Sequence, residues 1–179
     1  GDQVTTLENS WATLEFYDGT KVYLDDNTKL ILADVEIVDE GEKLLLELLE
    51  GRIWVSHNSE DQVLDLQVNT AVMNIQSVQG EYLVAHQGQQ EALYVYEGPV
   101  TAGYMDRSEE ERTIETAVLS SGEMSLLDEV TQIALQAREN VSLVEAARED
   151  MFTDSFVRWC RGETVTEEED DEPEVEIDT

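Results

Sequence analysis

This chain of 179 residues has one cysteine, two prolines and ten basic residues, and its apolar runs are short. Cys160 alone cannot form an internal disulfide, a thiolate metal cluster or a Cys-x-x-Cys redox pair. The longest apolar run, residues 44–49, is interrupted by Glu47 and is far shorter than the ~20 residues that cross a bilayer. There is no signal peptide, and the sequence begins at Gly1 rather than Met. We therefore expect a processed or trimmed N-terminus, with any membrane anchor lying outside the given sequence.

Basic residues are outnumbered by 42 acidic ones, which gives a formal net charge of −32. Such a surface repels phosphate, so nucleic acid and anionic membrane are poor partners. The acidity is explained either by a well-solvated surface, as in high salt, or by a site for a divalent cation or a basic partner. Calcium has no specific support, because no segment has the Asp-x-Asp-x-Asp-Gly spacing with a closing Glu. We expect no cofactor.

Short strands separated by turns are predicted between residues 12 and 127. Asp18-Gly19 predicts a tight hairpin that joins residues 13–17 to residues 20–24, because glycine tolerates a positive φ. Residues 43–57 are predicted as two strands with a bend at Gly51. Alternating apolar residues predict further half-buried strands. The residues of each of the following sets are expected to face the same side of their strand: Ile31, Ala33, Val35 and Ile37; Leu64, Leu66 and Val68; and Ile114, Thr116 and Val118.

This pattern predicts a mainly β fold, an antiparallel β-sandwich or β-roll, and disfavours a parallel βαβ sheet. Two or three C-terminal α-helices and an acidic tail should follow it. Val130, Ile133, Ala134 and Ala137 recur at helical spacing. Ser142 to Glu145 has the form of a capping box that opens a second helix, and Phe152, Phe156 and Trp159 indicate a third that ends at Gly162.

Three regions are expected along the chain. Residues 1–127 form an all-β domain, residues 128–162 form a helical extension, and residues 163–179 form an acidic tail. Nine acids lie between Glu167 and Asp178, and with so few apolar residues this tail is predicted to be disordered.

The β-region resembles the FecR domain through the order and spacing of several elements. They are Asp18-Gly19-Thr20 with the strand that follows, then residues 46–55, 66–71, 78–80, 94–100 and 118–123. One local departure is Gly80-Glu81, where the family pattern has Gly-Thr. Within these elements each glycine ends a strand at a sharp turn, and the following Val or Ile re-enters the core.

The resemblance implies an extracytoplasmic location, in the periplasm or at the cell surface, for a protein that is membrane-anchored at full length. FecR-like proteins are regulators whose outer β-domain senses a partner protein. The expected function is therefore protein–protein recognition in envelope signalling or assembly. Two alternatives remain open: a self-associating subunit of a surface layer or filament, and an acidic domain that binds calcium or polysaccharide.

No catalytic arrangement is evident in the sequence, and we expect no enzymatic activity. Gly-x-Ser-x-Gly, His-Glu-x-x-His and phosphate-binding loops are absent. His57 and His86 could share a site if their strands are neighbours, but two histidines alone make a weak metal or nucleophile site.

The candidate residues for contact with a partner protein are Trp54, His57, Phe156 and Trp159. Alternation along its strand makes Trp54 a candidate for the surface or a cleft. In the other interpretation, the tryptophans fill the core or the seam between the sheet and the helices. The orientation of the helix near residue 130 also bears on function. If Val130, Ile133 and Ala137 face solvent, they form a partner-binding stripe. If they pack on the sheet, the helix is a cap on the domain.

Overall fold

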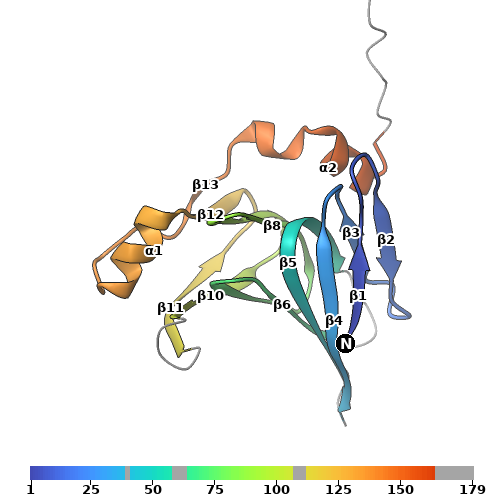
Figure 1. Ribbon diagram of the computed structural model, residues 1–179, viewed down its shortest axis with the longest axis horizontal. Coiled ribbons are helices and arrows are strands. Elements are labelled where there is room, and N and C mark those ends of the chain that lie inside the picture. Colours follow the sequence, from blue (N-terminus) through green and yellow to red (C-terminus); the bar gives the residue numbers. More distant parts are fainter. Residues whose placement is uncertain (39–40, 58–63, 107–111, 164–179) are drawn as a thin grey trace, which may run out of the picture.

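The computed structural model describes residues 1–38, 41–57, 64–106 and 112–163, and it shows two β-sheets packed face to face (Figure 1). Sheet A contains β1 (Asp2–Thr5), β4 (Lys29–Val38), the first part of β5 (Gly41–His57), β6 (Leu64–Asn69), β7 (Met73–Ser77), β10 (Val100–Asp106) and β11 (Arg112–Leu119). Sheet B contains β2 (Ala12–Glu15), β3 (Lys21–Leu24), the last part of β5, β8 (Gly80–Gln87), β9 (Gln90–Glu97), β12 (Glu123–Leu127) and β13 (Glu145–Ala146). The prediction of a mainly β fold, a sandwich or roll, is confirmed.

Strand β5 belongs to both sheets and bends at Gly51. Its φ of 98° lies in the region that glycine alone adopts without strain, and a Cβ here would collide with Thr28. The Thr28 hydroxyl also bonds the backbone of Arg52, donating to its carbonyl and accepting from its N–H, each over 3.1 Å. The predicted glycine bend is confirmed, although the two predicted strands form one continuous strand.

The hairpin between β2 and β3 is confirmed as well. Gly19 has a φ of 88°, and the Asp18 carboxylate accepts hydrogen bonds from the Thr20 N–H at 3.0 Å and from its hydroxyl at 2.6 Å. These bonds are a typical role for Asp in a turn, and they fix the register of the first two strands of sheet B.

The main core lies between the two sheets and consists of aliphatic and tyrosine side chains. Sheet A contributes Leu44, Leu46, Leu66 and Val68 among others, and sheet B contributes Ile53, Val55, Tyr82, Val84 and Leu93 among others. Leu66 and Val68 are buried as predicted, while the side chain of Leu64 lies outside the described part.

Two predicted alternations are wrong because β-bulges interrupt them. The register of β4 against β5 shifts between Leu32 and Asp34, and Leu30 enters the core, whereas Ile31 is half-buried. The side chains of Val35 and Ile37 are outside the described part. In β11 the register shifts near Ile114, so that Leu119 is buried and Val118 is 60% exposed. A bulge moves every later side chain to the opposite face.

One strand pair is parallel: β5 and β6 run in the same direction between Glu42 and Glu47. No helix connects them in the described residues, so this pair does not come from a βαβ unit. The other strand pairs of the described chain are antiparallel.

The first predicted helix is confirmed as α1 (Glu129–Gln136), which contacts β11 and β12 and inserts Leu135 into the main core. Asp128 caps it by accepting a hydrogen bond from the Thr131 N–H at 2.8 Å. This bond lowers the pKa of the Asp128 carboxyl.

The helix predicted to begin at Ser142 is wrong. Leu143 is buried in the main core, and Glu145 and Ala146 pair with β12 as strand β13. A capping box stabilises a helix by about 1 kcal/mol, which is less than burying a leucine and pairing a sheet edge contribute together.

A 3₁₀ helix (Glu149–Phe152) and α2 (Ser155–Cys160) follow, and Gly162 ends α2 with a φ of 69°. We call residues 147–163 the C-terminal segment; it runs across the outer face of sheet B (orange to red in Figure 1). Apart from Glu163, the predicted acidic tail lies outside the described residues.

Candidate functional site

Trp54 lies on the outer face of sheet B, the direction that alternation along β5 predicts. However, the C-terminal segment covers this face, and Trp54 is completely buried. Its ring packs 5.8 Å from that of Tyr96, and Tyr96 packs 5.4 Å from Phe152 of the segment. Trp54 is therefore part of the seam between sheet and segment, as the second interpretation of the tryptophans expected.

Phe156 and Trp159 project from α2 into the same seam. Phe156 is 1% exposed, whereas Trp159 is half-buried and stacks on Trp11, with ring centroids 4.9 Å apart. Tyr23 of β3 meets the edge of Trp159 at 5.3 Å. Of the two α2 aromatics, only Trp159 keeps a surface that a partner could touch.

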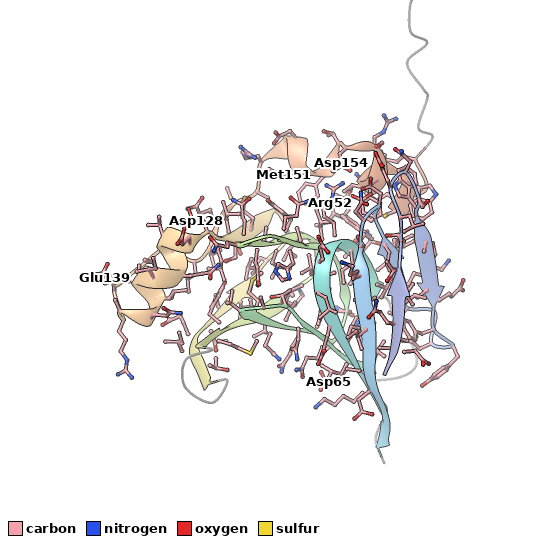
Figure 2. All side chains as sticks on the ribbon, viewed as in Figure 1. Arg52, Asp65, Asp128, Glu139, Met151 and Asp154 are labelled. Atoms are coloured by element: carbon pink, nitrogen blue, oxygen red, sulfur yellow. The ribbon has the colours of Figure 1, made fainter. Side chains whose placement is uncertain are left out.

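An ion cluster fastens the C-terminal segment to the sheet. Arg52 donates to Asp154 through Nη1 at 2.7 Å (Figure 2). It also donates to Asp25 through Nε at 2.6 Å, and its guanidinium lies 5.4 Å from the Phe156 ring. Asp154 also caps α2 by accepting from the Val157 N–H at 2.9 Å. One arginine thus connects β5, the turn after β3 and the start of α2.

Sequence reasoning missed this cluster. The sequence feature that could have indicated it is Arg52, a single cation in the strand Gly-Arg-Ile-Trp-Val. A charge within an apolar strand needs a partner of opposite charge. The partner Asp154 is 102 residues away in sequence, and no pattern in the sequence connects the two.

His57 points to the inner side, at the end of β5. It is 1% exposed, and in the described structure neither ring nitrogen has a hydrogen-bond partner. Burial lowers the pKa of His57, while the nearby charges of Asp18 and Asp65 act in the opposite direction. His57 is therefore a buried imidazole with almost no exposed surface in this conformation.

The two histidines do not share a site, although β5 and β8 are neighbours. The antiparallel register pairs His57 with Gly80 and His86 with Gly51, which places the histidines at opposite ends of the pair, roughly 20 Å apart. Among the residues that the structure describes, no three His, Cys, Asp or Glu side chains converge as metal ligands.

Cys160 lies on the buried side of α2, at 8% exposure. Burial raises the pKa of its thiol, and the charges of Asp25 and Asp154 raise it further. A thiol in this environment is unreactive.

The face of α1 that carries Val130, Ile133 and Ala137 points to solvent. Val130 is 73% exposed and Ile133 is 59% exposed, and Ala137 is exposed too. Leu135, on the opposite face, is the residue that packs into the core. We call Val130, Ile133 and Ala137 the α1 stripe. Acidic residues, Asp128 and Glu139, lie at the two ends of the helix (Figure 2).

The structure thus brings three of the four candidate residues to one seam and leaves His57 apart. Trp54 and Phe156 have almost no exposed surface while the C-terminal segment is in place, and His57 is buried separately at the end of β5. In the α1 stripe, by contrast, the apolar residues Val130 and Ile133 lie side by side and are mostly exposed.

No helix among the described residues is both long enough and apolar enough to span a membrane. The model of the FecR protein family matches residues 2–101, which is more than half of the chain. A search of curated proteins gives no match.

Two crystal structures of a protein described as an anti-sigma factor, from Parabacteroides distasonis ATCC 8503, have a similar fold. The structure at 2.50 Å resolution is 17% identical to this chain and the one at 1.65 Å is 16% identical, each with a TM-score of 0.63. Each match covers 90% of this chain and 65% of the other, so the chain spans less than two thirds of those proteins.

Proposed function

This chain belongs to the FecR protein family, and we propose that it is an extracytoplasmic protein–protein recognition module of an envelope signalling protein. The likeness in fold to a protein described as an anti-sigma factor supports a regulatory role rather than a catalytic one. The segments beyond the family match, residues 102–163, supply both the cover of sheet B and the exposed helix α1.

The observation that carries the proposal is the exposure of the α1 stripe. Val130 and Ile133 are one helical turn apart and both face solvent. Other exposed apolar residues, such as Leu7, Tyr17 and Val78, lie singly on separate turns, as is common on protein surfaces. Adjacent exposed apolar residues with a polar rim are typical of an interaction surface.

The expected partner is another protein with a basic rim around an apolar contact. The formal net charge of −32 favours encounter with a positive surface and opposes approach of a second copy of this chain. Self-association in a surface layer or filament is the second candidate, because the same stripe could serve it at high salt, where charges are screened.

Photo-crosslinking in the cells that naturally make the full-length protein tests the proposal. A photoreactive phenylalanine at position 130 should give a covalent adduct with a second protein, whereas the same group at Leu7, which is 71% exposed, should not. An adduct of twice the chain's own mass supports self-association and contradicts recognition of another protein. The absence of adducts at position 130, or equal yields at positions 7 and 130, also overturns the proposal.

The location is tested separately. An amine-reactive reagent that cannot cross the inner membrane should label the lysines of this domain in cells whose inner membrane is intact. Protection until the cells are lysed would place the domain inside the cytoplasm and contradict the proposal.

A further inference from the structure

A cleft opens where β6 and β8 leave the same edge of β5. Strand β6 pairs with β5 as far as Glu47, and β8 pairs with β5 from Gly51 onward. Between these points, residues 48–50 have no strand partner on this edge within the described chain. The gap forms a cleft of about 380 Å³, a size in the range of sites that bind small ligands.

Apolar and polar residues line this cleft together. Leu49, which is 44% exposed, and Met105 provide apolar surface. Glu47, Thr70 and His86 provide polar groups, and no Lys or Arg lines the cleft among the described residues. A ligand that suits both kinds of residue has an aliphatic part and a hydrogen-bond-donating, cationic end.

Behind Thr70 and His86 lies the carboxylate of Glu91, which is only 1% exposed. It accepts a hydrogen bond from the Thr70 hydroxyl and lies 3.1 and 3.2 Å from the Val72 N–H through its two oxygens. Its negative charge therefore lies next to two residues that line the cleft, Thr70 and His86.

His86 links this charge to the open edge. Its Nδ1 lies 3.3 Å from the Leu48 carbonyl, which can only accept, so Nδ1 carries the proton of that bond. Its Nε2 lies 3.9 Å from an oxygen of Glu91. The His86 ring therefore lies between the Glu91 carboxylate and the open edge of β5.

We propose that this cleft binds a Lys or Arg side chain presented by the partner protein, an inference that rests on the proposed recognition function. The aliphatic stem of such a side chain lies along Leu49 and Met105, and its cationic head donates to the Glu47 carboxylate near Thr70 and His86. A metal ion does not fit, because the described residues provide no set of three ligands. Arg and Lys combine an apolar stem with several donors, which is the chemistry that this cleft accepts.

Titration followed by NMR tests the cleft on the purified chain. The probes are Nα-acetyl-arginine N-methylamide and its lysine counterpart, compared with the neutral citrulline compound. Either cationic probe should shift the amide signals of Leu49, Ala71 and Met105 in a saturable way, and the citrulline compound should not. Glu47→Gln and Glu91→Gln should each weaken binding by roughly fivefold or more, since each removes a charged acceptor or the charge behind it.

Glu8→Gln is the matched control, because it removes the same charge from an exposed turn outside the cleft. Equal affinity in Glu8→Gln and Glu47→Gln, shifts spread over the whole surface, or equal binding of the citrulline compound would overturn the inference. If Glu91→Gln fails to fold, the half-buried Glu47 still decides the outcome. If position 130 gives adducts but the cationic probes do not bind, only the proposal for the cleft is contradicted. If the probes bind specifically but position 130 gives no adducts, recognition through the α1 stripe is contradicted.

Discussion

Two apolar surfaces outside the main core differ in whether the chain itself covers them. The outer face of sheet B, which includes Trp54, is covered by the C-terminal segment and fastened by Arg52. The α1 stripe is left open, with Val130 and Ile133 mostly exposed. The first surface therefore serves folding. The second contributes little to folding, which is why we assign it to recognition.

The largest expected effect is on the covered surface. Phe156→Ala removes a fully enclosed ring and should lower the free energy of unfolding by about 3 kcal/mol, whereas Ile133→Ala should change it by less than ~0.5 kcal/mol. Urea unfolding of both variants measures the difference. Similar losses in the two variants would show that the stripe is also packed, and would remove the contrast.

Arg52→Met should have the next largest effect. It leaves Asp25, whose side chain is 7% exposed, without its cation. We expect a loss of about 2 kcal/mol, less than for a fully buried pair because Arg52 and Asp154 keep contact with solvent. Lys21→Met is the control: its exposed pair with Glu15 spans 3.9 Å and should contribute less than ~0.5 kcal/mol. Equal losses in the two variants would mean that the ion cluster does not fasten the segment.

His57→Leu should stabilise the protein by about 1 kcal/mol at pH 7.5, because it replaces a buried imidazole that lacks partners. The variant should also lose less stability on acidification. The pKa of His57 is lower in the folded state than in the unfolded state, so below pH ~6.5 the unfolded chain takes up a proton first and the wild type loses stability. Unfolding measured from pH 7.5 to 5 tests both points, and identical pH slopes in the two proteins would contradict them.

Cys160 reports whether the C-terminal segment opens on its own. Asp154→Ala removes the cap of α2 and a hydrogen bond to Arg52. We expect the free energy of opening the C-terminal segment to fall by about 1 kcal/mol, so a thiol reagent should label Cys160 roughly fivefold faster. Asp128→Ala, which removes the equivalent cap of α1, should leave the labelling rate unchanged. If both variants accelerate labelling equally, the thiol reacts only through global unfolding.

The comparison also shows what the sequence could predict. Strand alternation correctly predicted that Trp54 faces away from the main core, but only tertiary packing decides whether another segment covers it. Helical spacing correctly grouped Val130, Ile133 and Ala137, yet Leu135 on the other face is the residue that packs. The wrong strand faces at Ile31 and Val118 come from bulges, which local patterns do not reveal. The Arg52–Asp154 contact joins residues far apart in the chain and lies beyond any local signal.

The most direct test of recognition through the α1 stripe is the double variant Val130→Glu with Ile133→Glu, carrying the photoreactive group at Ala137. We expect the free energy of unfolding to stay within ~0.5 kcal/mol of wild type, because both side chains are exposed. The adduct with the second protein should disappear, while Leu7→Glu, an equally exposed apolar-to-acidic change, should keep it. A double variant that folds normally and still forms the adduct at full yield would contradict the assignment of this surface.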